Sequence, residues 1–118
     1  SKEINDCIGY LELHLGEKLN MSALAESVGY NKNYLSTKFS REVGVSLSDY
    51  LARLRVERAK LALRNTSESI QQISERLGFG SVSYFSAQFR KAAGQTPSDY
   101  RNRRGGAAAP PETLQSGS

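Results

Sequence analysis

The sequence is poor in the residues from which catalytic and metal sites are usually built. Its 118 residues include one cysteine, one histidine and no tryptophan. The single thiol, Cys7, cannot form an internal disulfide, which agrees with a reducing cytosol. It lies in an apolar stripe, so we expect a buried core residue. No catalytic triad or metal site can be assembled around His14, and no phosphate-binding glycine loop is present. We therefore predict no enzymatic activity, no cofactor and no metal.

Long hydrophobic runs are also missing. No apolar stretch approaches the ~20 residues that a membrane-spanning helix needs. The chain opens with Ser1-Lys2-Glu3 and an amphipathic pattern in place of the apolar segment of a signal peptide. We therefore expect a cytoplasmic protein without a membrane partner.

Charged residues are unevenly distributed along the chain, whose formal net charge is +4. Residues 32–64 carry eight basic residues against three acidic ones, and residues 90–104 carry five against one. Residues 1–31 are acidic and residues 65–89 are nearly neutral. Two basic blocks suit a polyanion that is contacted in two places. Taken alone, they fit solvated helix faces equally well.

Nearly every segment before residue 105 has the periodicity of an amphipathic helix, and none alternates for long enough to be a convincing strand. We therefore predict an all-α fold, with helices that begin at capping residues and end at glycines. The expected caps are Ser22, Asn31, Ser46, Ser69, Ser81 and Thr96, and the expected stops are Gly16, Gly29, Gly44, Gly78 and Gly94. Residues 105–118, rich in Gly, Ala and Pro, are expected to be a flexible tail, part of which could derive from an expression vector.

An internal repeat is the strongest signal in the sequence. Residues 24–30, Leu-Ala-Glu-Ser-Val-Gly-Tyr, match residues 73–79, Ile-Ser-Glu-Arg-Leu-Gly-Phe, at an offset of 49. From Tyr34 to Arg53 the offset is 50, so the second copy has one more residue in its turn. Each copy has the pattern of a short helix, a glycine turn and a longer helix, which is typical of a helix-turn-helix.

The longer helix of each copy has an outward stripe without an acidic residue. In the first copy Leu35, Phe39 and Val43 are expected to face inward. The outward residues are then Lys32, Asn33, Ser36, Thr37 and Arg41 in the first copy, and Val82, Ser83, Ser86, Ala87 and Arg90 in the second. Small side chains without acids suit close entry into a DNA groove, because acidic side chains would repel phosphate.

The second copy also carries a long composite motif. It consists of Ile73, Gly78-Phe79, Ser83-Tyr84-Phe85, Phe89-Arg90-Lys91, Gly94 and Thr96-Pro97 followed by Tyr100-Arg101. On these residues the chain resembles the DNA-binding domain of AraC/XylS-type transcription regulators, across roughly residues 4–104. The resemblance implies seven helices in two helix-turn-helix subdomains, residues 1–45 and 65–104, joined by a linker helix at about residues 46–64. It also implies that the helices near residues 32–43 and 82–93 enter successive major grooves on one face of DNA.

The resemblance can be carried onto individual residues. It implies base contacts from Asn33, Ser36, Thr37, Val82, Ser83, Ser86 and Ala87. We expect phosphate contacts from Lys32, Arg41, Ser81, Arg90, Lys91 and Arg101. Asn33 is suited to bidentate adenine readout, whereas the second copy offers mostly methyl and hydroxyl groups.

The expected linker helix also has a suitable length for two grooves. A helix of ~19 residues is about 28 Å long, which is close to the roughly 34 Å between successive major grooves. DNA bending would absorb the difference. Because the two copies are related by repetition along one chain, the DNA site should lack palindromic symmetry.

The resemblance further implies a bacterial regulator of the nucleoid, most commonly an activator, that binds double-stranded DNA and works with RNA polymerase. It also implies an N-terminal sensing or receiver domain beyond this fragment. The fragment itself should be monomeric, since no heptad seam is left over for a dimer. An all-helical module that binds an acidic protein is an alternative, although it gives no reason for a repeated glycine turn. RNA binding is disfavoured because A-form grooves do not readily admit helices.

Overall fold

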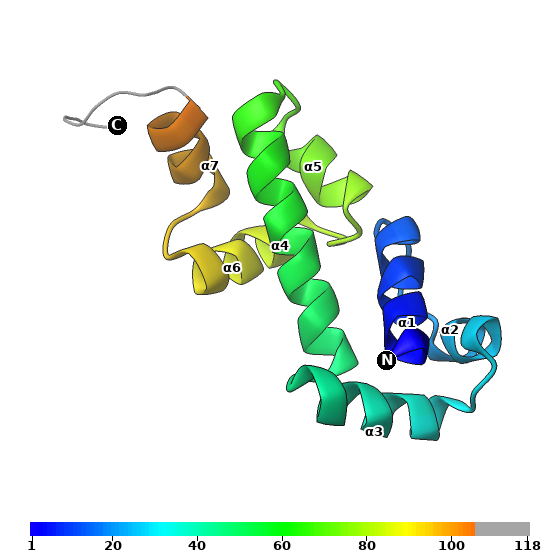
Figure 1. Cartoon of the computed structure of the whole chain (residues 1–118). Coiled ribbons are helices and arrows are strands. Elements are labelled where there is room, and N and C mark those ends of the chain that lie inside the picture. Colours follow the sequence, from blue (N-terminus) through cyan, green and yellow to red (C-terminus); the bar gives the residue numbers. More distant parts are fainter. Residues whose placement is uncertain (106–118) are drawn as a thin grey trace. The chain divides into compact units, whose positions relative to one another are not determined.

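Figure 1 shows a computed structural model of the chain, which describes residues 1–105. These residues form seven α-helices and no strand, so the all-α prediction is confirmed. The helices are α1 (Lys2–Leu13), α2 (Met21–Val28), α3 (Lys32–Val43), α4 (Leu47–Asn65), α5 (Ile70–Arg76), α6 (Val82–Ala93) and α7 (Pro97–Tyr100), and a π-helical turn, η1, follows at Arg101–Gly105. The expected tail lies outside the described residues from position 106 onward.

The chain divides into two units at a point within α4, between Leu54 and Arg55. Unit 1 contains α1, α2, α3 and the first half of α4; unit 2 contains the second half of α4 and the helices after it. Helix α4 is continuous over the region where a linker helix is expected, about residues 46–64, and each of its halves supplies buried residues to its own unit.

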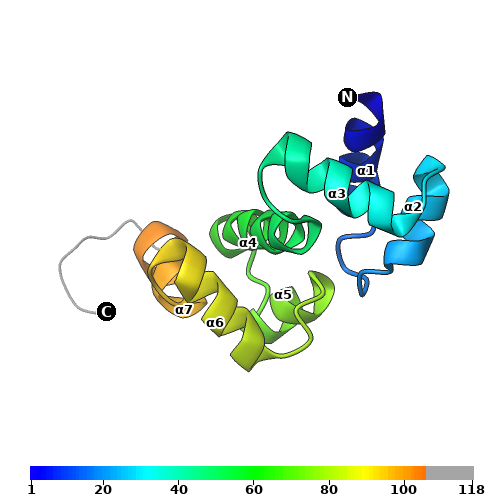
Figure 2. The ribbon, with the colours of Figure 1, turned by 90° about the horizontal axis from the view of Figure 1, so that it is seen from below.

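In unit 1, α3 lies across α1 and contacts α2 (Figures 1 and 2). The buried core residues are Ile4, Cys7, Leu11, Leu15, Leu24, Ala25, Leu35, Phe39, Leu47 and Leu51. Cys7 is fully buried, as expected, and burial raises the pKa of its thiol to about 11. Since a thiolate is the reactive form of cysteine, Cys7 acts as a small apolar residue at neutral pH.

In unit 2, α6 contacts α5 and α7, and Figure 2 shows the turn to α5 at one end of α6. The buried core residues are Val56, Ala59, Ala62, Leu63, Ile73, Leu77, Phe79, Phe85, Phe89 and Tyr100. One aromatic contact occurs in both units with the same geometry. Phe39 and Tyr50 meet edge to face at 5.4 Å and 74°, and Phe89 and Tyr100 at 5.4 Å and 75°. The sequence repeat is therefore a repeat of packing as well.

Most expected helix ends are observed. The side chains of Asn31, Ser46, Ser69, Ser81 and Thr96 each accept a hydrogen bond from the backbone N–H three residues later. Ser69 and Gln72 complete the capping box reciprocally, because the Ser69 backbone N–H donates to the Gln72 side chain at 2.8 Å. Gly29, Gly44 and Gly94 end their helices in the left-handed conformation.

Three expected ends were wrong. Asn20, not Ser22, caps α2, by accepting from the Ala23 N–H at 3.0 Å. Helix α1 ends at Leu13 and is capped by His14, before the expected stop at Gly16. Helix α5 ends at Arg76 with Leu77 as its cap, and Gly78 follows in the turn. Both glycines that open the helix-turn-helix turns, Gly29 and Gly78, have a φ of +83°.

Replacement of glycine by alanine should change the free energy of unfolding in opposite directions at two positions, Gly78 in a turn and Gly9 inside a helix. Gly78→Ala should destabilise the protein by about 1–2 kcal/mol, because a left-handed φ strains an L-residue. Gly9 lies inside α1, and a Cβ added there would have no heavy atom within 4 Å. Gly9→Ala should therefore stabilise by about 0.5–1 kcal/mol through helix propensity. Chemical denaturation of both variants tests this, and a neutral Gly78→Ala would contradict the assigned turn.

Ser74 is a buried polar residue whose hydroxyl has no hydrogen-bond partner. Its counterpart in the first copy is the buried Ala25. Ser74→Ala should therefore stabilise by about 1 kcal/mol, since it removes an unsatisfied buried group and improves helix propensity. The control is Ser22→Ala on the exposed face of α2, where only the smaller propensity gain applies. Equal gains at the two serines, measured by thermal unfolding, would contradict this.

Candidate nucleic-acid interface

Helix α3 turns one face to the core of unit 1 and the opposite face to solvent. Asn31 orients its first turn by accepting a hydrogen bond from the Tyr34 N–H at 2.8 Å. Leu35 and Phe39, one turn apart, are fully buried, and Val43 is half-buried. Of the expected contact residues, Lys32, Asn33, Thr37 and Arg41 are exposed and Ser36 is half-buried. The structure thus exposes four of these five side chains to solvent and leaves Ser36, which lies one turn before Phe39, at the boundary of the buried face.

Helix α6 repeats this arrangement in unit 2. Phe85 and Phe89 are fully buried, and Val82 is 40% exposed in spite of its apolar side chain. The expected contact residues Ser83, Ala87, Arg90 and Lys91 are exposed, and Ser86 is half-buried. Ser81 is exposed and caps the helix, because its hydroxyl oxygen accepts from the Tyr84 N–H at 3.1 Å. Its hydroxyl hydrogen can still donate to another group.

The two helices match position by position in their degree of burial. From the caps Asn31 and Ser81 to residues 43 and 93, each residue is buried, half-buried or exposed as its counterpart fifty positions away is. The identities of the buried residues are close, whereas those of the exposed residues differ except at Tyr34 and Tyr84. Each unit therefore holds a helix of the same orientation relative to its own core but with different chemistry on its outer face.

The outward stripes of α3 and α6 contain no acidic side chain. Helix α6 contains no acid, and Glu42 is the single acid of α3. The Glu42 carboxylate pairs with Lys38 Nζ at 3.0 Å and with the amino group of Ser1 at 3.2 Å. The hydrogen bond from Lys38 lowers the pKa of Glu42 and raises that of Lys38. The outward stripe of both helices is thus neutral or basic, as a surface that approaches phosphate must be.

Arg101 has a different position from the other expected phosphate contacts. Its Nε donates to the backbone carbonyl of Leu63 at 3.1 Å, and its Nη2 donates to that of Thr66 at 3.2 Å. It thereby ties η1 to the C-terminal end of α4. We therefore assign Arg101 a structural role and leave it out of the proposed phosphate contacts.

This assignment can be tested without changing charge. Arg101→Lys keeps the cation but cannot reproduce two divergent hydrogen bonds from one planar group. It should destabilise the protein by about 1–2 kcal/mol, a loss of several degrees in Tm. Arg103→Lys on an exposed position is the control. If Arg101→Lys melts like the wild type but binds DNA more weakly, Arg101 is a phosphate contact after all.

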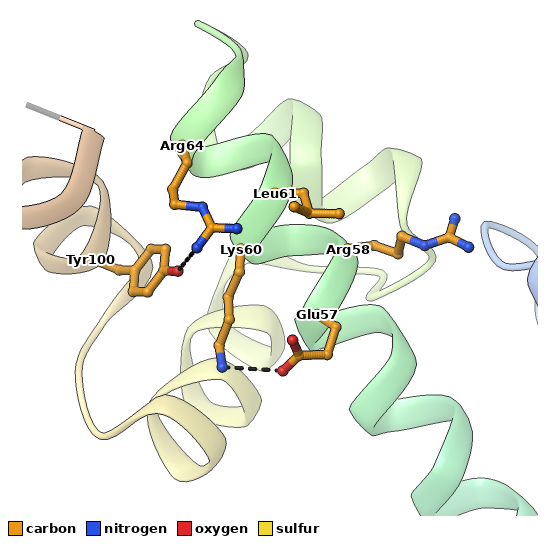
Figure 3. Close-up of a pocket in the computed structure, with 6 residues that line it drawn as sticks. All are labelled: Glu57, Arg58, Lys60, Leu61, Arg64 and Tyr100. Carbon is orange, nitrogen blue, oxygen red and sulfur yellow. Dashed lines mark hydrogen bonds and ion pairs between the residues drawn. The ribbon is translucent and has the colours of Figure 1, made fainter.

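A hollow in unit 2 lies beside α4 (Figure 3). It has a volume of about 390 Å³ and is lined by Glu57, Arg58, Lys60, Leu61, Arg64 and Tyr100. Two of its cations are engaged: Lys60 pairs with Glu57 at 3.1 Å, and Arg64 donates to the Tyr100 hydroxyl at 3.3 Å. Figure 3 shows Arg58 pointing away from Tyr100. The hollow brings together no nucleophile, base or metal-ligand set.

Within residues 1–105, no three His, Cys, Asp or Glu side chains gather closely enough to hold a metal ion. None of the helices in this part of the chain is long and apolar enough to span a membrane.

Sequence reasoning missed two exposed aromatic residues at the edge of the outward stripes. Tyr34 is 48% exposed and Tyr84 is 51% exposed, although the sequence pattern indicates them only as markers of the repeat. Their shared offset of 50 and their place directly before a buried aliphatic or aromatic residue were visible in the sequence. Their exposure could not be derived from periodicity alone.

Comparisons with known proteins agree with this geometry. A family model described as a helix-turn-helix domain matches residues 24–103. A solved transcriptional regulator from Chromobacterium violaceum, described as AraC-type and DNA-binding, superposes with a TM-score of 0.83 and 30% identity, covering 91% of this chain and 96% of that one. The solved DNA-binding domain of AdpA, in complex with a target DNA, has the same fold, with a TM-score of 0.81, 22% identity and coverage of 92% and 100%.

A longer relative is also similar. An uncharacterized HTH-type transcriptional regulator of Staphylococcus aureus (strain MSSA476) is 39% identical over 102 residues, which is 86% of this chain and 14% of the relative. The chain therefore spans a small part of that protein. From the family model and the AraC-type structure together, the chain belongs to the helix-turn-helix family of AraC-type DNA-binding transcription regulators, which are not enzymes.

Proposed function

We propose that α3 and α6 are two recognition helices that enter successive major grooves on one face of a non-palindromic DNA site. The observation that carries the proposal is the match in burial between the two helices over residues 31–43 and 81–93. Each unit exposes the same side of one helix, and that side carries no acidic residue. This repetition supports docking of both helices on DNA in the same way. The 19 residues of α4 correspond to about 28 Å, near the groove spacing of roughly 34 Å.

The two helices would read DNA by different chemistry. Asn33 supplies both a donor and an acceptor, which suits adenine, while Ser36 and Thr37 add hydrogen bonds of low selectivity. On α6, Val82 and Ala87 would contact thymine methyl groups, and Ser83 and Ser86 would add hydroxyl contacts. We propose phosphate contacts from Lys32, Arg41, Ser81, Arg90 and Lys91, which hold the protein in register without reading sequence.

The relatives' length supports a further part of the proposal. Because a similar regulator is far longer than this chain, we propose that the domain serves a larger protein with an N-terminal sensing or receiver domain. Bound at a promoter, such a protein would act with RNA polymerase. The fragment alone is proposed to be monomeric, since the apolar side chains of both helix-turn-helix units are largely used in their own cores.

Because the two helices are proposed to contact DNA by different chemistry, substitutions on them should affect DNA binding in two distinct ways. The probes are a duplex selected by the protein from a randomised library and a scrambled duplex of the same composition. Asn33→Ala should cost roughly 1–3 kcal/mol on the selected duplex alone. Arg90→Ala should weaken binding to both duplexes and lower the log–log salt slope by about one unit.

Affinities are measured for each duplex across a salt series. Glu26→Ala, an exposed change on α2 away from both stripes, is the control for general effects on folding. If Asn33→Ala weakens both duplexes equally while Arg90→Ala alters the preferred sequence, the assigned roles are wrong. If selection yields a palindromic site, the proposed use of two unlike helices on one face is wrong.

A further inference from the structure

Tyr34 and Tyr84 are exposed aromatic side chains that the core does not explain. They occupy the same position in the two copies, the third residue of α3 and of α6. Each leaves about half of its side chain in solvent, 48% for Tyr34 and 51% for Tyr84, while the next residue in each helix is fully buried. A half-exposed tyrosine, with an apolar ring and a polar hydroxyl, thus recurs at the same place in both copies.

Each tyrosine begins a flank of hydrogen-bonding side chains along one edge of the outward stripe. Residues spaced i, i+4 and i+7 share one side of a helix. On α3 this flank is Tyr34, Lys38 and Arg41, and on α6 it is Tyr84, Gln88 and Lys91. Both flanks end in an exposed cation that is already a proposed phosphate contact. By this spacing each tyrosine lies on the same edge of the stripe as that cation, two helical turns or about 10 Å from it along the helix axis.

Neighbouring rings hold both tyrosines in place. Tyr34 lies against Tyr30 with ring centroids 5.0 Å apart, and Tyr84 lies against Phe79 at 6.4 Å. Tyr30 and Phe79 are the aromatic residues that follow the turn glycines. Packing against Phe79 involves the ring of Tyr84, and the hydroxyl interacts electrostatically with the Arg55 side chain of α4. A hydroxyl on a side chain that is already held loses little entropy when it binds a ligand.

We infer that the Tyr34 and Tyr84 hydroxyls donate hydrogen bonds to DNA phosphate oxygens and act as positioning residues for the two recognition helices. This inference rests on the proposed function. Tyrosine side chains are among the usual donors to phosphate, and such contacts fix register without reading sequence. A hydroxyl and a cation about 10 Å apart on one edge would hold a helix at two points along one wall of a groove roughly 12 Å wide.

The test removes the hydroxyl oxygen of each tyrosine by substitution with phenylalanine. Tyr34→Phe, Tyr84→Phe and the double variant are compared with wild type on the selected and scrambled duplexes. Each single change should weaken binding about five- to tenfold on both duplexes, because a hydrogen bond to a charged acceptor is lost. The salt slope should not change, because no charge is removed, whereas Arg41→Ala and Lys91→Ala should each lower it by about one.

Tyr10→Phe is the matched control, since Tyr10 stacks on His14 in α1, away from both stripes. It should leave affinity unchanged, and the Tm of all four phenylalanine variants should equal that of wild type. Wild-type affinity in Tyr34→Phe and Tyr84→Phe would overturn the inference and leave the proposed function standing. A loss confined to the selected duplex would also overturn it, since the hydroxyl would then read a base. If wild type binds neither duplex, the proposed function itself fails.

Discussion

The structure depends on the burial of two side chains, one helical turn apart, beneath each of the helices α3 and α6. Leu35 and Phe39 under α3, and Phe85 and Phe89 under α6, are all completely excluded from water. Burial of four such side chains removes any freedom of each helix to rotate about its own axis, because rotation by one position would expose an aromatic ring. The side of the helix that faces solvent, which contains the outward stripe, is then determined by the position of the buried pair.

This constraint explains which features were predictable from sequence. The limits expected for the recognition helices, near residues 32–43 and 82–93, are those observed, because a cap, a buried pair and a terminal glycine all coincide there. Helix α2 was harder, since Asn20 and Ser22 are both good caps and local sequence does not decide between them. Arg101 shows a further limit of sequence reasoning. Its partners, the carbonyls of Leu63 and Thr66, lie more than thirty residues away, and any exposed arginine has the same local pattern.

The candidate site was predictable in position but less so in chemistry. The outer face could be listed because it repeats with the helical period, and Asn33 and Arg90 are indeed exposed. The exposure of Tyr34 and Tyr84 could not be listed in this way, because aromatic residues beside a core are usually counted as part of it. Only the ring contacts with Tyr30 and Phe79, made at the edge of each core, show why these tyrosines stay half in solvent.

The two copies act as an internal comparison of what the fold requires and what it leaves open. One aromatic pair is nearly identical in both, since Phe39–Tyr50 and Phe89–Tyr100 differ by 1° in interplanar angle. The outer faces differ at almost every position, from Asn33 to Ser83 and from Thr37 to Ala87. The same core therefore accepts unrelated outer residues, since these side chains make few contacts inside their own unit. Changes on the stripe should accordingly alter DNA preference at little cost in stability, while changes beneath it should do the reverse. That separation allows one scaffold, used twice in a chain, to present two outer faces of different chemistry.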